Sequence, residues 1–187
     1  MELFDALTSR STAKTYGESA PTREHLDQVL QAAVRAPDHG RLRPWRFMLI
    51  AGDQRRKLGD LLAASARRRV PGLSEGDLQR ERDKALRAPL IIVTACRVVP
   101  GTKVPAVEQI LAAGAATQNI LLALHALGYA AAWKTGEAAY DPEVKKAMGL
   151  AADDHIIGLV YTGGGRGATF ATGKPASVQD AMLEFPG

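Results

Sequence analysis

The sequence predicts an α/β or α+β protein, because strand-like segments alternate along the chain with segments of helical periodicity. Four apolar runs have the length and composition of strands, and they fall at about 45–50, 89–96, 129–134 and 156–161. Of the 187 residues, 46% are hydrophobic and 24% charged, which is typical of a soluble globular protein. No repeat, low-complexity tract or linker divides the chain, so we expect one domain over residues 1–187.

Helical patterns occupy most of the remaining chain. We expect helices at about 1–9, 22–36, 53–70, 76–87, 105–127 and 142–148. Pro37 disfavours helical geometry in the residue before it, so the second helix should end near residue 36. In the first helix Leu3, Phe4 and Leu7 are expected to face inward, and Gly128 is well placed to cap the fifth.

The helix expected at 105–127 has a centre of small residues, Ala112-Ala113-Gly114-Ala115-Ala116, which would let another helix or a sheet approach closely. Residues 110–127 are also the best candidate for a membrane span. That stretch contains Gln118, Asn119 and His125, and half of its apolar residues are alanine. A buried helix of a soluble protein is therefore the better interpretation.

The single cysteine, Cys96, lies in the apolar run expected as the second strand. One cysteine cannot form a disulfide within the chain, which fits a reducing compartment. No obviously electropositive neighbour activates it, so we expect a buried structural thiol rather than a nucleophile. The first residues lack a basic region followed by a long apolar one, so we expect no signal peptide and a cytoplasmic protein.

The net charge of +4 raises the possibility of a nucleic-acid or small anionic ligand. The tightest basic run, Arg67-Arg68-Arg69, has no aromatic residue nearby on which a base could stack. Residues 80–87 mix acidic and basic side chains, as a solvated helix face does. These patterns disfavour nucleic acid.

Several common sites are excluded or disfavoured. The run from Gly163 to Ala168 formally fits G-x-G-x-x-A, but only 19 residues follow it, too few for a dinucleotide-binding unit. A plain surface turn is favoured there over a turn that places Arg166 near a phosphate. The four histidines share no metal-ligand spacing, so we expect no metal, and no Gly-x-Ser-x-Gly elbow is present.

Two loops carry polar chemistry that packing does not explain. The segment Arg10-Ser11-Thr12-Ala13-Lys14-Thr15-Tyr16 combines hydroxyls with cations and suits an anionic group, although an exposed polar loop is the simpler interpretation. The segment from Arg35 to Trp45 combines cations, an imidazole and a large aromatic around two prolines. His39 on this loop has more claim to a ligand than His125, which helical periodicity favours for the core, and Trp45 is expected in the core.

Taken together, these motifs resemble the nitroreductase family, and most closely its small bacterial NAD(P)H branch. The resemblance covers nearly the whole chain in order. Its motifs are residues 10–16, Arg35-Ala36-Pro37-Asp38-His39, Pro44-Trp45-Arg46-Phe47 and Tyr129-Ala130-Ala131-Ala132-Trp133-Lys134-Thr135-Gly136. The resemblance implies an α+β fold with a central, mostly antiparallel sheet flanked by helices, in an intertwined homodimer that binds two FMN molecules at its interface.

The resemblance also implies roles for individual residues. Arg10, Ser11 and Thr12 would hold the FMN phosphate, and Lys14 would lie near the flavin pyrimidine edge. Residues expected to reach the flavin from the partner subunit are Arg35 and His39, and those expected to line it are Trp133, Lys134 and Thr135. The nicotinamide-binding stretch of the branch falls on Ala123, Leu124, His125, Ala126, Leu127 and Gly128, which look like ordinary helix packing.

The chain departs from the family pattern at three places. Ser11 replaces the second arginine of the signature, so one phosphate cation is missing, and Arg166 is a candidate replacement. Arg43 stands where glutamine is common and would favour anionic donors or acceptors. Lys134 and Thr135 replace arginine and serine, which keeps the charge and the hydroxyl but loses the guanidinium fork.

The implied activity is ping-pong electron transfer from NADH or NADPH through FMN to a nitroaromatic, a quinone or a similar small acceptor. Solvent can supply the protons, so no catalytic residue is named. Two other classes stay open. One is an FMN-binding protein that stores or senses the flavin without turnover, and the other is a basic nucleic-acid-binding module.

Overall fold

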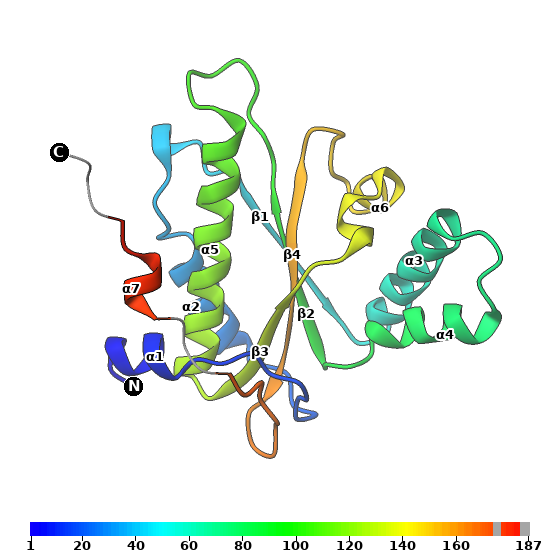
Figure 1. The fold of residues 1–187 in the computed structure, drawn as a ribbon, viewed down its shortest axis with the longest axis horizontal. Coiled ribbons are helices and arrows are strands. Elements are labelled where there is room, and N and C mark those ends of the chain that lie inside the picture. Colours follow the sequence, from blue (N-terminus) through cyan, green and yellow to red (C-terminus); the bar gives the residue numbers. More distant parts are fainter. Residues whose placement is uncertain (174–176, 184–187) are drawn as a thin grey trace.

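The computed structural model describes residues 1–173 and 177–183, and its centre is one antiparallel sheet (Figure 1). The strands are β1 (Trp45–Ala51), β2 (Leu90–Cys96), β3 (Tyr129–Lys134) and β4 (His155–Gly164). Their order is β1-β2-β4-β3, and each neighbouring pair runs antiparallel. The α+β class is confirmed, and each expected strand forms where the apolar runs placed it.

Helices cover both faces of this sheet. They are α1 (Leu3–Ser9), α2 (Arg23–Ala33), α3 (Gln54–Arg69), α4 (Glu75–Lys84), α5 (Ala106–Ala126), α6 (Pro142–Ala147) and α7 (Val178–Ala181), with 3-10 turns η1 (His39–Arg41) and η2 (Glu137–Tyr140). Helix α2 stops three residues earlier than predicted, because the last turns tighten to i→i−3 hydrogen bonds such as Ala36 N–H to Ala33 O. Gly128 adopts a φ of 81° just beyond α5 and ends it as expected.

Two apolar cores lie on opposite faces of the sheet. One core packs α5 and α2 against the sheet around Ile92, Ile120 and Val160. The other packs α3, α6 and η2 against the opposite face around Ile91 and Leu159. In Figure 1, α5 and α2 lie on one side of the strands, and α3 with α4 projects on the other. Alternation along β4 divides its side chains between these two cores.

Helix α5 is long and apolar enough to cross a membrane by length and composition alone. Its apolar surface is used inside the chain, where it contacts α2, β2, β3 and β4. Ala112, Ala113 and Ala116 are buried in this core, and Asn119 Nδ2 donates to Ala32 O on α2 at 3.0 Å. The small residues therefore permit close packing against the chain's own sheet and α2.

Cys96 and Trp45 are buried, as the sequence predicted. Burial raises the pKa of the Cys96 thiol to about 11, with a smaller contribution from the Asp154 carboxylate. The thiol is thus held in its protonated, unreactive form at neutral pH.

The prediction for the first helix is wrong within this chain. Leu3, Phe4 and Leu7 are exposed, with Phe4 at 77%, and only Ala6 of this helix is buried. The reason is that α1 contacts the rest of the chain mainly near one end of α5, so its apolar side chains have no core to enter.

The surface turn expected at residues 163–168 forms only in its second half, around the exposed Arg166 and Gly167. Gly163 and Gly164 are the last residues of β4 and pair with β3. A Cβ on Gly163 would lie 2.4 Å from Gly17 O, and one on Gly165 would lie 2.4 Å from Gly128 O. The run is needed because two other backbone segments pass directly over the strand end.

Candidate functional site

The loop at residues 10–17 lies along the open edge of the sheet. Ala13 N–H donates to Ala131 O of β3 at 3.0 Å, and Gly17 N–H donates to Gly164 O at the end of β4 at 2.8 Å. Because β3 is the last strand in the sheet, this loop covers an edge that would otherwise be unpaired. The sequence gives the loop an irregular, polar character, and the structure fixes its path.

The segment that follows β4 runs beside this loop. Lys14 N–H donates to Thr169 O at 2.8 Å, and Ala171 N–H donates to Thr12 O at 2.7 Å. Arg166 lies on the same returning segment, three residues before Thr169. The fold therefore brings the backbone that carries Arg166 to the loop that carries Arg10 and Ser11, although more than 150 residues separate them in the sequence.

Four polar side chains of this loop have no side-chain partner in the part of the chain that the structure describes. Among residues 1–173 and 177–183, no side-chain hydrogen bond or ion pair involves Arg10, Ser11, Thr12 or Lys14. Thr15, in contrast, bonds to Thr169 and helps to fix the loop. A rigid loop with two hydroxyls and two cations available to a ligand suits an oxyanion such as a phosphate.

The end of α5 lies against the start of the same loop. Ser9 Oγ lies 2.8 Å from His125 Nε2, and it also donates to Asp5 O at 2.5 Å. Burial, and then the charge of Arg10, lower the pKa of His125. His125 is half-buried rather than part of the core, and it connects α5 to the residue that precedes Arg10.

The six residues predicted for nicotinamide binding occupy the end of α5 and its cap. Leu124 is fully buried, and Ala123 and Leu127 pack on the core beneath α5. Ala126 and Gly128 are exposed. Their role in nucleotide binding stays a prediction.

Trp133 and Lys134 leave β3 on opposite faces, as successive residues of a strand must. The indole of Trp133 lies over Gly158, and its Nε1 donates to Ile157 O at 3.0 Å. A Cβ on Gly158 would lie 2.0 Å from that nitrogen, so the absence of a side chain there decides where the indole lies.

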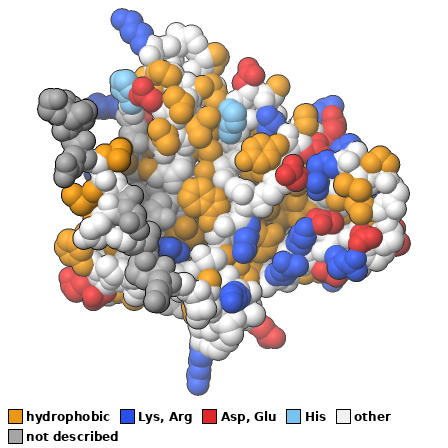
Figure 2. Space-filling view, viewed as in Figure 1, with side chains coloured by type: hydrophobic (Ala, Val, Ile, Leu, Met, Phe, Trp, Pro, Cys, Tyr) orange, Lys and Arg blue, Asp and Glu red, His pale blue; other side chains and the backbone are white. Residues whose placement is uncertain are grey.

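Lys134 and Thr135 line a pocket of about 370 Å³ between β3, η2 and the α3–α4 pair. The other wall includes Arg69, Glu81 and Lys84. Figure 2 shows Lys and Arg side chains gathered over this part of the molecule, between the sheet and α3–α4. The mixed charges of residues 80–87 predicted a helix face exposed to solvent. They did not indicate that Glu81 and Lys84 of α4 would line a pocket.

Two tyrosines continue this polar wall toward the loop. Tyr161 of β4 lines the pocket, and Tyr16 stacks on it with ring centroids 6.4 Å apart. Burial raises the pKa of Tyr16 to about 12, so both phenols stay neutral at physiological pH. The residues from Arg10 to Tyr16 therefore lead along the sheet edge toward the pocket.

His39 lies away from this site within one chain, and Arg35 makes no contact with it among the described residues. His39 Nδ1 lies 2.5 Å from Glu108 Oε2 in the first turn of α5, whereas Ser9 contacts His125 in its last turn. At 1.5 Å per residue, those two positions on α5 are about 25 Å apart. Arg35 is exposed, and the described residues give its side chain no hydrogen bond or ion pair.

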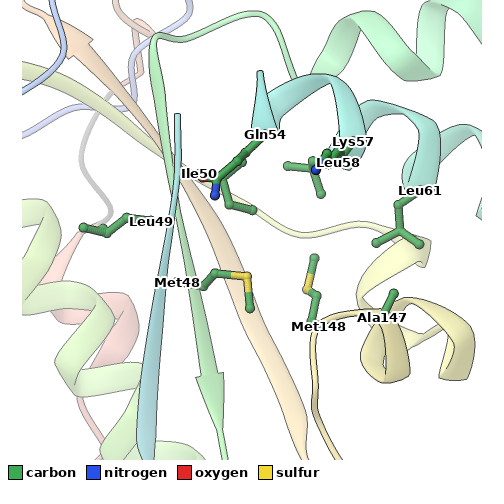
Figure 3. Close-up of a pocket in the computed structure, with 9 residues that line it drawn as sticks. All are labelled: Met48, Leu49, Ile50, Gln54, Lys57, Leu58, Leu61, Ala147 and Met148. Atoms are coloured by element: carbon green, nitrogen blue, oxygen red, sulfur yellow. The ribbon is translucent and has the colours of Figure 1, made fainter. Parts of the chain in front are cut away.

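A second pocket, of about 300 Å³, has a different character (Figure 3). It lies between β1, α3 and α6, and Figure 3 shows Met48, Leu58 and Met148 directed into it. Only Gln54 and Lys57 add polar groups. None of the predicted site residues lines it, and it has no convergent polar groups that would define a reactive centre.

The chain matches the nitroreductase family over residues 7–164. It is 34% identical over 163 residues to a protein of Escherichia coli (strain K12) named “Putative NAD(P)H nitroreductase YdjA”, with 87% of this chain and 88% of that protein covered. A protein of Haemophilus influenzae named “Putative NAD(P)H nitroreductase” is 35% identical over 166 residues, with 88% of this chain and 89% of that protein covered. The chain therefore belongs to the nitroreductase family, as its four motifs predicted.

Solved structures agree with this assignment. A nitroreductase-like protein from Bacillus cereus superposes with a TM-score of 0.84 at 25% identity, and 100% of this chain and 97% of that chain are covered. A “putative nitroreductase in complex with FMN” from Desulfovibrio desulfuricans gives a TM-score of 0.74 at 26% identity, with 100% and 98% covered.

Proposed function

We propose that this protein is an FMN-dependent oxidoreductase that uses NADH or NADPH to reduce nitroaromatics, quinones or similar small acceptors by a ping-pong mechanism. For a nitro compound the balanced reaction is R–NO₂ + NAD(P)H + H⁺ → R–NO + NAD(P)⁺ + H₂O. The observation that carries the proposal is the loop at residues 10–17. Its hydroxyls and cations have no side-chain partner among the described residues, apart from Thr15, and its Tyr16 stacks on Tyr161 in the wall of a cation-lined pocket. Family membership and the FMN named for the Desulfovibrio desulfuricans structure support it.

The residues present fit FMN chemically. Arg10, Ser11 and Thr12 offer donors for the phosphate, and Arg166, three residues before the Thr169 that bonds to this loop, is our candidate for the missing cation. Lys14 lies two residues before Tyr16, which stacks on Tyr161 in the wall of the pocket where the ring would lie. When bound, FMN supplies hydride acceptance and electron transfer to the acceptor.

The pocket residues orient the ring and its surroundings. Lys134 brings positive charge to the pocket that would receive the electron-rich edge of the flavin, and Thr135 adds a hydroxyl. The ion pair between Lys84 Nζ and Glu81 Oε1 at 2.5 Å fixes the α4 wall. These groups bind and position, and we assign none of them a proton-transfer role.

We further propose that two copies associate and that Arg35 and His39 of each copy serve the flavin held mainly by the other. Two observations support this. Within one chain His39 lies about 25 Å from the start of the loop at 10–17, measured along α5, and Arg35 is exposed. The exposed Phe4 of α1 and Leu111 of α5 also leave apolar surface uncovered near both ends of α5, as an interface would require.

The visible spectrum of the purified full chain, before and after anaerobic NADH or NADPH, tests the proposal. We expect flavin absorbance that either nucleotide bleaches, and steady NAD(P)H consumption when menadione or a nitrofuran is added. Bound flavin that neither nucleotide bleaches would instead support storage or sensing. A colourless protein that cannot be reconstituted with FMN would overturn the proposal, and sedimentation as a monomer would overturn the dimer.

A further inference from the structure

The three consecutive arginines at the end of α3 have different surroundings. Arg67 Nη2 lies 3.4 Å from Glu75 Oε2, and Arg68 Nη2 lies 2.7 Å from Asp141 Oδ2. Arg69 lines the pocket beside Lys134 and has no hydrogen bond or ion pair among the described residues. The basic run that was weighed as a nucleic-acid site is thus divided. Two of its arginines are paired with carboxylates, and the third faces a cavity.

The remaining charges of this pocket leave Arg69 available to a ligand. Lys84 is neutralised by Glu81, to which its Nζ donates at 2.5 and 2.6 Å. With that pair set aside, the described lining of the pocket has one acidic residue, Glu137, and two basic residues, Arg69 and Lys134. The wall therefore carries a net positive charge with its donors unsatisfied, in contrast to the ion-paired outer surface of α3–α4.

We propose that Arg69, together with Lys134 on the β3 wall, binds an oxyanion of the substrate, and that this oxyanion is a carboxylate carried by the electron acceptor. A guanidinium presents paired donors that match a carboxylate, whereas the Lys134 ammonium acts as a point charge. Arg69 also lies in the last turn of α3, where the helix dipole favours a cation. This assignment rests on the proposed function, because it takes the pocket as the place where the acceptor enters.

The test compares two acceptors of similar size, 4-nitrobenzoate and 4-nitrobenzamide, which differ in charge. We expect the Arg69→Gln variant to lose about tenfold in kcat/KM for the carboxylate and to stay within about twofold for the amide, because a charged hydrogen bond of this exposed kind is worth about one power of ten. The loss should come mainly in KM. In the unmodified protein, the preference for 4-nitrobenzoate over 4-nitrobenzamide should shrink as salt is added. Arg67→Gln is the matched control, since that side chain pairs with Glu75 outside the pocket.

A binding measurement separates this site from turnover. Calorimetric titration of the oxidised protein with benzoate should show binding that benzamide lacks and that Arg69→Gln, but not Arg67→Gln, abolishes. Equal loss for both acceptors, or unchanged benzoate binding in Arg69→Gln, would overturn the proposal. The carboxylate assignment would also be overturned if Arg69→Gln lowered kcat/KM for NADPH while kcat/KM for NADH and for both acceptors stayed unchanged. That outcome would mean that Arg69 binds the extra phosphate of NADPH. A protein that holds no FMN would overturn the proposed function, while benzoate titration would still decide whether Arg69 binds an oxyanion.

Discussion

Replacing Gly158 with alanine should displace the indole of Trp133. The new Cβ would lie 2.0 Å from Nε1 and 2.4 Å from Cδ1 of that ring, whereas ordinary contact begins at 3.4 Å. The nitrogen must therefore move by at least 1.4 Å, the difference between 3.4 and 2.0 Å. Its hydrogen bond to Ile157 O, now 3.0 Å long, cannot survive such a shift.

The expected cost follows from these two effects. Overpacking at a tight site costs about 1–3 kcal/mol. Losing the hydrogen bond of Trp133 adds about 0.5–1.5 kcal/mol. Trp133 is 36% exposed, so its indole can rotate toward solvent and relieve part of the overlap. We therefore expect Gly158→Ala to lower the free energy of unfolding by about 2–3 kcal/mol in total.

Urea unfolding followed by far-UV circular dichroism measures this cost, and a double-mutant cycle assigns it. In a Trp133→Ala background the ring is gone, and Gly158→Ala should cost less than about 1 kcal/mol, the remainder reflecting a Cβ 3.1 Å from Lys134 O. The two substitutions should therefore show a coupling energy above about 1 kcal/mol. Costs that add within about 0.5 kcal/mol would refute the packing argument.

Three further predictions concern separate parts of the molecule. Arg10→Ala should weaken FMN retention at least tenfold in fluorescence titrations, with the exposed Arg23→Ala as control, and unchanged affinity would remove Arg10 from the phosphate site. Burial alone would raise the pKa of the Asp141 carboxyl. The hydrogen bonds that this carboxylate accepts, among them those from Arg68, outweigh burial and hold its pKa below the usual range. A lowered pKa stabilises the fold above the unfolded value near 3.8, so Asp141→Asn should cost about 1.5–3 kcal/mol at pH 7, and this cost should fade as the pH falls below about 4. An equal loss at pH 7 and pH 3 would contradict that linkage. Cys96, with a pKa near 11, should react with a thiol reagent at pH 8 far more slowly in the folded than in the urea-unfolded protein, and rapid stoichiometric labelling of the native chain would show the thiol to be accessible.

Local patterns predicted the strands and the long helices well, because each strand is an apolar run bounded by turn residues and the helical segments have the length and periodicity of helices. The same reasoning failed for α1. A pattern of apolar residues indicates which side of a helix seeks burial, and it does not reveal whether the chain provides a core there. Phe4 is exposed for that reason.

The glycines at the end of β4 show a second limit. Their sequence predicts conformational freedom, but Gly163 and Gly164 are extended strand residues that lack side chains because another segment lies over them. The same holds for Gly158, whose neighbour Trp133 lies 25 residues away. A close approach between distant segments leaves no local signal beyond the glycine itself.

By itself the sequence determined the fold class, the membership of a family and the polar loop at residues 10–17, since these depend on local composition and on motif order. Only the tertiary structure placed the segment from Thr169 to Ala171 beside that loop, turned one side of α4 toward a pocket, and separated Arg69 from its two paired neighbours. The physical reason is that a charged residue has the same local pattern whether it meets solvent, a carboxylate or a cavity. Its surroundings are supplied by elements far away in the chain, and they exist only once the chain has folded.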